Sequence, residues 1–269
     1  MASTNTSANK GTAVVTGAST GIGAIYADRL AERGYDLILV ARNIERLKAL
    51  AHRISEKTGR KVTPVAADLN DRVARANIES ILREDKSITM LVNNAGIGSV
   101  ASILDANVDE MEAMIDLNVT ALTRLTYAVA PVFAAKGSGT IINIASVVGI
   151  GVELLNGVYS ASKSYVLSFG HSLQKDLAEK GVRIQTVLPG GTATEFWDVA
   201  GYAKVKEAPT TMTAEDLVDA ALVGLDNGEL VTIPPLQNDE DWANWEAARR
   251  ELTPKFANAK PGPRYGLSS

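Results

Sequence analysis

The sequence predicts an α/β fold in which helices cover both faces of a doubly wound parallel sheet. Short β-branched or aliphatic runs, bounded by turn residues, alternate with amphipathic stretches along most of the 269 residues. This alternation is typical of a parallel sheet. The length suits one large domain, and 46 % of the residues are apolar, which is ordinary for a globular protein.

The predicted strands are short apolar runs whose composition indicates burial on both sides. They cover residues 12–16, 37–41, 62–66, 90–92, 140–145, 183–188 and 230–233. Between and after them, apolar residues recur at helical spacing, and several of these stretches end at a glycine, as helices commonly do. The predicted helices cover residues 22–32, 44–56, 72–82, 108–135, 159–179, 214–225 and 239–252.

Residues 11–236 are predicted to form a single domain, because no long linker and no internal repeat divides them. Residues 1–10 are polar, and we expect them to be disordered. Pro234 and Pro235 stop the last predicted strand. Residues 237–269, which contain a charged helix and a tail rich in proline and glycine, are therefore predicted to be a C-terminal extension.

The composition argues against several classes of site and partner. With 27 basic and 31 acidic side chains the net charge is −4, which disfavours binding to nucleic acid or to an acidic membrane. The chain has no cysteine, and its two histidines are His52 and His171, so we expect neither a metal site nor a catalytic histidine. The polar N-terminal segment lacks the apolar core of a signal peptide, and no apolar run reaches the ~18 residues that span a bilayer. We therefore expect a cytoplasmic protein.

A glycine-rich turn follows the first predicted strand and opens the first predicted helix. Glycine permits positive φ and a close approach of the backbone, while a helix start offers unpaired N–H groups. Together these features form a cradle for a dinucleotide pyrophosphate; the alternative is a tight turn without a ligand. The candidate cofactor residues in this turn are Gly17, Ser19, Thr20, Gly21, Ile22 and Gly23.

The spacing of this turn, Thr16-Gly17-Ala18-Ser19-Thr20-Gly21-Ile22-Gly23, is G-x-x-x-G-x-G. It resembles the T-G-x-x-x-G-x-G turn of the short-chain dehydrogenase/reductase family, and the resemblance extends from Gly11 to Ile233. The resemblance implies a Rossmann-like domain that transfers hydride between a nicotinamide cofactor and a carbonyl or alcohol group.

The end of the second strand indicates which dinucleotide binds. An acidic residue there would hold the ribose 2′-hydroxyl of NAD, but this chain has Ala41 followed by Arg42, with Arg46 one helical turn further on. Arg42 can bind a 2′-phosphate through paired donors, and in the family this substitution implies NADP(H). NAD(H) stays open as an alternative, because Thr20 stands where NADP-binding relatives often carry a second basic residue. The other interpretation of Arg42 is a solvated charge.

Three further motifs complete the predicted cofactor site by resemblance. Asp68 and Leu69 follow the third strand, where the family's Asp contacts adenine; the alternative role of Asp68 is an N-cap for the next helix. Asn94, Ala95 and Gly96 belong to an N-N-A-G run that matches the family motif residue for residue. The family's segment that holds the nicotinamide carboxamide is matched by Pro189, Gly190, Thr192 and Thr194, with Thr192 in place of the usual branched aliphatic residue.

Ser146, Tyr159 and Lys163 occur in an order that resembles the family's active site, with Asn118 upstream. Tyr159 and Lys163 are four residues apart, so they lie on one face of the predicted helix. A tyrosine has an ordinary pKa of about 10, and a nearby ammonium or nicotinamide cation favours the phenolate form during proton transfer. Ser146 can donate to the substrate oxygen. By resemblance, Tyr159 and Lys163 also contact the cofactor, and Asn118 kinks its helix and holds a water for proton transfer.

An apolar substrate pocket is predicted beside the catalytic residues. Residues 190–209 are less periodic and carry several aromatic side chains, which suggests a loop over a site. The alternative is that Phe196 and Trp197 only pack this loop onto the domain. The predicted pocket residues are Ser146, Leu154, Tyr159, Phe196, Trp197 and Tyr202.

The helices that begin near Val108 and Tyr159 are rich in alanine and leucine, and an apolar helix needs a second surface to bury. In the family these two helices pair between subunits, so we expect a homodimer or a homotetramer. We predict an NADP(H)-dependent oxidoreductase that acts on a carbonyl or secondary alcohol of a small molecule. The alternatives are an NAD-dependent dehydrogenase, a reductase of carrier-linked 3-oxoacyl chains and a cofactor-sensing protein without catalysis.

Overall fold

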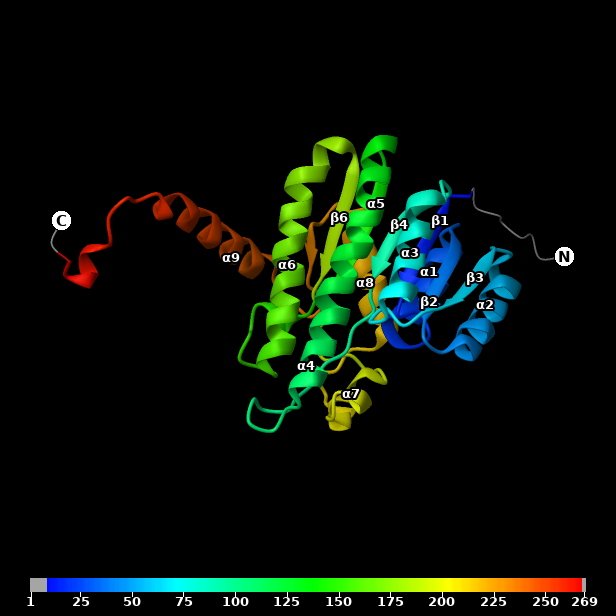
Figure 1. The fold of residues 1–269 in the computed structure, drawn as a ribbon, viewed down its shortest axis with the longest axis horizontal. Coiled ribbons are helices and arrows are strands. Elements are labelled where there is room, and N and C mark those ends of the chain that lie inside the picture. The colour runs from blue at the N-terminus through cyan, green and yellow to red at the C-terminus, as the bar shows by residue number, and fades with distance from the viewer. Residues whose placement is uncertain (1–8, 268–269) are drawn as a thin grey trace. The chain divides into compact units, whose positions relative to one another are not determined.

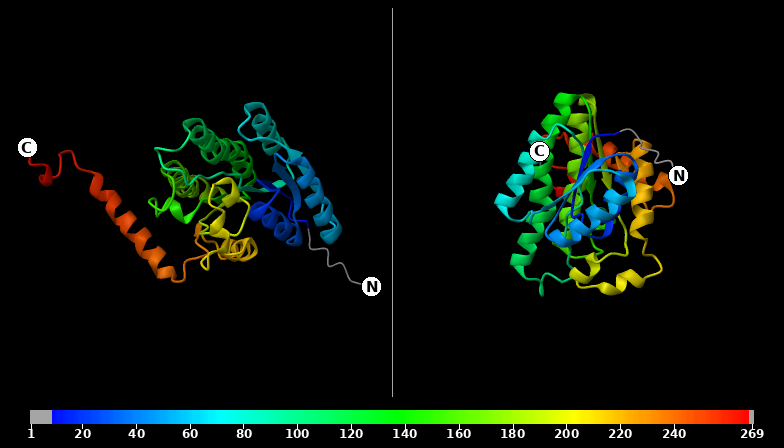
Figure 2. Two further views of the ribbon diagram at one scale, coloured as in Figure 1. Left: turned by 90° about the horizontal axis from the view of Figure 1, so that it is seen from below. Right: turned by 90° about the vertical axis from the view of Figure 1, so that its right-hand side faces the viewer.

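The computed structural model describes residues 9–267, and its sheet confirms the predicted doubly wound α/β fold. Within that range, seven parallel strands form one sheet in the order β3-β2-β1-β4-β5-β6-β7. The ribbon views show this sheet between two layers of helices (Figures 1 and 2). The chain reverses its direction of travel across the sheet between β1 and β4, which is where parallel sheets bind ligands, at the carboxyl ends of the strands.

The elements occupy ranges close to the predicted ones. The strands are β1 (Thr12–Thr16), β2 (Asp36–Ala41), β3 (Val62–Ala66), β4 (Ile88–Asn93), β5 (Gly139–Ile144), β6 (Val182–Val187) and β7 (Val231–Thr232). The helices are α1 (Gly21–Glu32), α2 (Ile44–Thr58), α3 (Arg72–Glu84), α4 (Val108–Ile115), α5 (Leu122–Lys136), α6 (Gly157–Leu177), α7 (Phe196–Val199), α8 (Ala214–Asp226) and α9 (Asp239–Leu252).

Two apolar cores flank the sheet. Helices α1, α2 and α8 bury one set of side chains against it, including Tyr26, Leu47 and Leu217. Helices α3, α5 and α6 bury a second set against the other face, including Ile78 and Phe133. Because the central strands are covered on both faces, their sequences are continuous apolar runs and do not alternate with polar residues.

Two predicted elements differ in the structure. The single helix expected over residues 108–135 is interrupted by a π-helical segment, Asp116–Ala121, between α4 and α5. The last strand, expected over residues 230–233, contains only Val231 and Thr232, which pair with β6. Pro234 and Pro235 come after the next residue, Ile233, and since proline lacks a backbone N–H it cannot extend the ladder.

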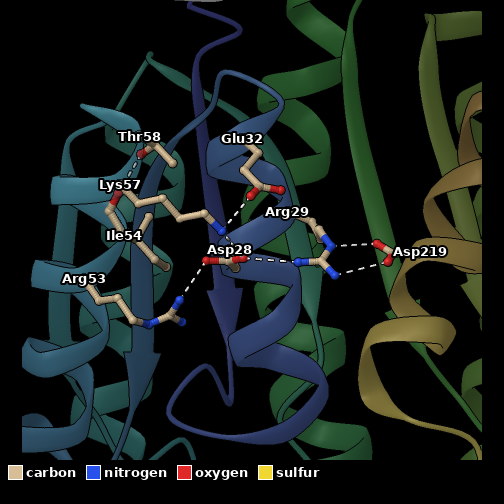
Figure 3. Close-up of polar contacts among 8 residues, drawn as sticks. All are labelled: Asp28, Arg29, Glu32, Arg53, Ile54, Lys57, Thr58 and Asp219. Atoms are coloured by element: carbon tan, nitrogen blue, oxygen red, sulfur yellow. Dashed lines mark hydrogen bonds and ion pairs between the residues drawn. The ribbon is translucent and has the colours of Figure 1, made fainter. Parts of the chain in front are cut away.

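A charged cluster joins the helices that cover one face of the sheet (Figure 3). Asp28 on α1 is buried, and its carboxylate accepts hydrogen bonds from Arg53 at 3.0 Å and Lys57 at 3.1 Å, both on α2. The neighbouring Arg29 forms a two-point ion pair with Asp219 on α8, at 2.7 and 3.1 Å. Salt bridges therefore connect α1 to both helices beside it.

Replacing Asp28 by Asn is expected to lower the free energy of unfolding by about 2 kcal/mol at pH 7. Burial alone would raise the pKa of this carboxyl, but the hydrogen bonds and charges of Lys57 and Arg53 outweigh burial and hold the pKa below its ordinary value of 3.8. Such a group contributes stability that is present above the unfolded pKa and is lost as the pH falls through the folded pKa. The difference in the free energy of unfolding between variant and wild type should therefore become smaller below pH 4.

Urea denaturation at pH 7 and at pH 3 measures this difference. Asp219→Asn is the matched control, because it removes a solvent-exposed ion pair and should change stability by less than about 1 kcal/mol. If Asp28→Asn lost the same free energy of unfolding at pH 7 and at pH 3, the charge of Asp28 could not be the cause of the loss.

The chain divides into two compact units, the second of which begins at Pro235. Within that unit, Asn238 caps α9 by accepting from the Glu240 N–H, and Trp242 and Trp245 stack at 4.8 Å. At the other end of the chain, residues 1–8 of the segment predicted to be disordered lie outside the described residues. Asn9 is placed by a hydrogen bond to Asp36.

Candidate active site

The glycine-rich turn lies between β1 and α1 and is held by the residue that follows β4. Gly17 and Gly21 have positive φ angles of 64° and 55°. The amide of Asn94 donates to the carbonyl oxygens of Thr16 and Gly17, at 2.9 and 3.2 Å. A Cβ on Gly23 would lie 2.4 Å from the Gly17 oxygen and 2.5 Å from Asn94 Nδ2. The turn needs glycine at these positions, and Asn94, predicted as a cofactor contact, also fixes the shape of the turn.

One continuous cavity of about 600 Å³ extends from this turn to Tyr159. A glycine cradle at one end and a buried tyrosine at the other fit a nicotinamide dinucleotide with room for a small substrate. The predicted residues that line the cavity are Gly17, Ser19, Thr20, Gly21, Ile22, Ala41, Arg42, Arg46, Asp68, Leu69, Asn94, Ala95, Gly96, Ser146, Leu154, Tyr159, Lys163, Pro189, Gly190, Thr192, Thr194, Phe196 and Trp197. Lining residues that the site predictions did not name include Asn70, Leu117, Ile144, Val147 and Val148.

Three predicted residues lie outside the lining. Gly23 lies beneath the turn and Asn118 lies behind the loop after β4. Tyr202 is half-exposed and outside the cavity, contrary to the prediction, because α7 carries the chain past the cavity before this residue. The two histidines are also elsewhere: His52 lies 3.3 Å from Glu56 on the same helix, and His171 is on the far half of α6.

Two arginines lie at the end of the cavity where the adenosine ribose is expected. Arg42 is exposed, and within residues 9–267 it makes no ion pair. The guanidinium of Arg46 pairs with the carboxylate of Glu195 at 2.7 Å, although these residues are 149 positions apart. Arg42 is therefore the guanidinium available to a 2′-phosphate, whereas Arg46 would first have to leave Glu195.

Asp68 and Leu69 line the cavity just after β3. The alternative role of Asp68 as the N-cap of the next helix is wrong, because Asp71 caps α3 by accepting from the Ala74 N–H at 2.7 Å. Asp68 accepts instead from the Asn70 N–H at 3.0 Å, which closes the turn before the helix. Leu69 is buried and gives this part of the cavity an apolar wall of the kind that suits a purine ring.

Asn118 lies at the centre of the π-helical segment and is almost completely buried. Its side chain accepts from the Ile97 N–H at 3.0 Å and donates to the Ile97 carbonyl oxygen at 2.9 Å and to Ser162 Oγ at 3.1 Å. The helix is irregular at the residue where the sequence resemblance implies a kink. Asn118 thus joins the loop after β4 to α6, the helix that carries Tyr159.

The side chains of Ser146, Tyr159 and Lys163 are buried together beside the ends of β5 and β6. Asn156 positions the start of α6 by accepting from the N–H groups of Val158 and Tyr159. Lys163 Nζ donates to the Ile144 carbonyl oxygen at 2.9 Å and lies 5.7 Å from the centre of the Tyr159 ring. The structure therefore assembles the three predicted residues into one cluster.

Burial controls the protonation of this cluster. It raises the pKa of the Tyr159 phenol well above its ordinary value of 10, and a hydrogen bond from Ser146 offsets only part of that effect. Burial also lowers the pKa of the Lys163 ammonium to about 8. The protein's own groups therefore keep Tyr159 protonated at neutral pH, where it can donate a proton. Burial, and not Lys163, therefore determines the direction in which the Tyr159 pKa departs from its ordinary value.

Aromatic side chains form the wall of the cavity next to Tyr159. The ring of Phe196 lies 5.7 Å from that of Tyr159 and meets Trp197 edge to face at 5.2 Å. Trp197 is buried, and its Nε1 donates to the Thr192 carbonyl oxygen at 2.9 Å. A Cβ on Gly98 would lie 2.4 Å from the Phe196 ring, so only glycine permits this packing. Trp197 anchors the loop, and Phe196 faces the reacting groups.

The described residues contain neither a candidate metal site nor a candidate membrane-spanning helix. No three histidine, aspartate or glutamate side chains in residues 9–267 are grouped so that they could hold a metal ion. In the same part of the chain, no helix combines the length and the apolar character needed to cross a membrane.

Comparison with known proteins gives consistent matches. Residues 11–203 match the family model of the short chain dehydrogenases. The structure is similar to that of a short-chain dehydrogenase from Sphingobium yanoikuyae in complex with NADPH, with a TM-score of 0.92 and 44 % identity, covering 95 % of this chain and 100 % of that one. A bulky-bulky ketone specific alcohol dehydrogenase from Comamonas testosteroni gives a TM-score of 0.88 and 42 % identity, covering 96 % and 99 %. The NADP-dependent 3-hydroxy acid dehydrogenase of Schizosaccharomyces pombe is 32 % identical, covering 82 % of this chain and 89 % of that one.

Proposed function

Because this chain belongs to the short-chain dehydrogenase family, we propose that it reduces ketones to secondary alcohols with NADPH. The reaction class is that of the family: the protein is an oxidoreductase that transfers hydride between NADP(H) and a carbonyl or alcohol group. The observation that carries the proposal is the single cavity that joins an exposed Arg42 to the buried cluster of Ser146, Tyr159 and Lys163. Two observations support ketones with two large substituents as the substrates. The similar Comamonas enzyme is specific for such ketones, and Phe196 forms an aromatic wall beside Tyr159.

NADPH, when bound, supplies the hydride. The glycine turn would hold its pyrophosphate, with the α1 N-terminus behind it, and Arg42 would hold the 2′-phosphate through paired donors. Asp68 and Leu69 would contact the adenine. At the nicotinamide end, the segment after β6 that contains Thr192 and Thr194 would hold the carboxamide, and Lys163 would bind the ribose hydroxyls.

Tyr159 acts as the general acid of ketone reduction in this proposal. Its phenol donates a proton to the carbonyl oxygen as negative charge develops there, and Ser146 stabilises the same oxygen by a hydrogen bond. In the reverse direction Tyr159 is the base. After this transfer the Lys163 ammonium would give a proton to the Tyr159 phenolate, and the Lys163 amine would regain a proton from solvent. Asn118 is a positioning residue that fixes the loop after β4 against α6.

Replacing Arg42 by Ala is expected to weaken NADPH binding about tenfold to a hundredfold and to leave NADH binding within about twofold. Only NADPH carries the 2′-phosphate that the guanidinium would bind. Titration of the purified protein with each cofactor, followed by nicotinamide fluorescence or calorimetry, measures both effects. Lys48→Ala, which removes a cation on α2 that is paired with Glu45, is the matched control. Preferential binding of NADH by the wild type would favour an NAD-dependent dehydrogenase, and binding of neither cofactor would contradict an enzymatic role.

We also propose that the protein is a cytoplasmic homodimer that pairs through α5 and α6. An aromatic stripe supports this interface: Tyr127 on α5 stacks on Phe169 of α6 at 6.3 Å, and Tyr165 stacks on the same ring at 5.6 Å. Tyr127 and Tyr165 are exposed, and an exposed apolar patch of this kind marks interfaces. Light scattering should give twice the chain mass of 28.4 kDa, or four times that mass for a tetramer, and Tyr127→Asp should reduce it to the mass of one chain.

A further inference from the structure

Exposed apolar side chains lie on three loop segments, two of which also contribute residues to the cavity lining. Ile103 and Leu104 are 92 % and 90 % exposed, on the loop before α4. Val152 and Leu154 are exposed on the loop before α6, and Val199 and Tyr202 are exposed at the end of α7 and just after it. We refer to these six residues as the apolar rim. Their three segments gather at one end of the domain, beyond the ends of α4, α6 and α7 (Figure 1).

Hydrogen bonds hold the three segments of the apolar rim together. The Val100 N–H donates to the Ala200 carbonyl oxygen at 3.3 Å, which joins the first segment to the third. Asn156 Nδ2 donates to the Ala101 carbonyl oxygen, which joins the first segment to the second. The same Asn156 caps α6 at Tyr159, so the position of the rim is linked to that of the catalytic helix.

The apolar rim is continuous with the interior of the cavity. Leu154 and Val199 belong to the rim and also line the cavity. Inside them, Tyr159 and Phe196 pack with Leu155 in one apolar cluster. The apolar lining around the reacting phenol therefore reaches the protein surface at Leu154 and Val199.

We propose that the apolar rim is an outer binding site for the uncharged, apolar tail of an extended ketone substrate. The proposal rests on the proposed ketone reductase function. A tail too long for the cavity would leave it over Leu154 and Val199 and cover Ile103 and Leu104, and this burial would favour binding. A protein partner seated on the rim would close the entrance through which substrate and product pass. Glu153 and Asp105 are exposed beside the rim, so their carboxylates would repel an anionic tail.

The test is a series of acetophenones with para-alkyl tails from methyl to octyl, reduced with NADPH at concentrations below their solubility limits. For the wild type, kcat/KM should rise about twofold per methylene once the tail reaches the rim, because a half-buried methylene gains about half of the full transfer free energy. In the double variant Ile103→Ser, Leu104→Ser the rise should disappear. The octyl ketone should then be reduced about tenfold more slowly, and the methyl ketone at the wild-type rate.

The matched control is Val73→Ser, Val223→Ser, which replaces two exposed apolar side chains that do not line the cavity; it should retain the wild-type dependence on tail length. If kcat/KM rose equally with tail length in the rim variant and in the wild type, the proposal would be overturned. A loss of oligomer mass in the rim variant, measured by light scattering, would also overturn it, because the rim would then be a subunit interface. Turnover of the methyl ketone by the wild type tests the proposed function separately, and its absence would overturn both proposals.

Discussion

The Tyr159→Phe variant is expected to reduce ketones at least about a thousandfold more slowly than the wild type while binding NADPH within about twofold of the wild-type affinity. The substitution removes the phenol proton that must reach the carbonyl oxygen and keeps the ring that packs on Phe196. A change in the chemical step without a change in cofactor binding distinguishes a proton donor from a residue that only shapes the cavity. Steady-state rates and cofactor titrations on the same preparation provide both measurements.

Tyr165→Phe is the matched control for this variant. Tyr165 lies on the same helix, but its hydroxyl bonds Thr123 at 2.8 Å on the outer surface, so the loss of this phenol should leave the rate unchanged. Retention of more than about a tenth of the activity by Tyr159→Phe would contradict the assigned role.

The second large effect is expected from the Gly23→Ala variant. This substitution should weaken NADPH binding more than about tenfold and destabilise the domain by about 2 kcal/mol. The added methyl group would lie 2.4 Å from the Gly17 carbonyl oxygen and 2.5 Å from Asn94 Nδ2. Neither atom is free to withdraw, since Asn94 bonds Thr16 and Gly17. The turn must therefore open, and its N–H groups lose the arrangement that suits a pyrophosphate.

Fluorescence titration with NADPH and thermal unfolding test this prediction. Gly262→Ala is the control, because its φ of −62° is ordinary and a Cβ there would meet no atom closer than 4.0 Å. Unchanged NADPH affinity in Gly23→Ala would show that the turn can adapt, and that the glycine at this position is not needed for binding.

The sequence was sufficient to predict the order and type of the main elements because each one has a local cause. The strands β1, β2, β4, β5 and β6 are largely buried apolar runs, whereas the edge strand β3 is only partly covered. Helices such as α2 and α5 end at glycines, Gly59 and Gly137, in the left-handed conformation. The last strand is shorter than predicted. Its length depends on pairing with β6, which reaches only Val231 and Thr232 before Pro234.

Motifs could predict many of the residues that line the cavity but not how these residues pair with one another. Arg46 has the spacing of a phosphate ligand, yet Glu195, brought beside it by the loop after β6, binds its guanidinium. Similarly, the fit of Phe196 against Gly98 joins segments almost a hundred residues apart, and nothing local to either one marks it. Contacts of this kind depend on the assembled fold, and they decide which predicted residues are available to a ligand.

The π-helical segment also determines the directions in which the side chains of α4 and α5 point. Met111, Met114, Leu125 and Val129 recur at the spacing of a single apolar stripe, which a regular α-helix would turn toward one partner. A π turn takes up about one additional residue, and one residue corresponds to about 100° of rotation. The stripe is therefore split: the methionines of α4 pack with Tyr159, while Leu125 and Val129 of α5 face the core of the sheet. The irregular turn at Asn118 sets the rotational phase between α4 and α5, so one stretch of sequence contributes to both the active site and the core.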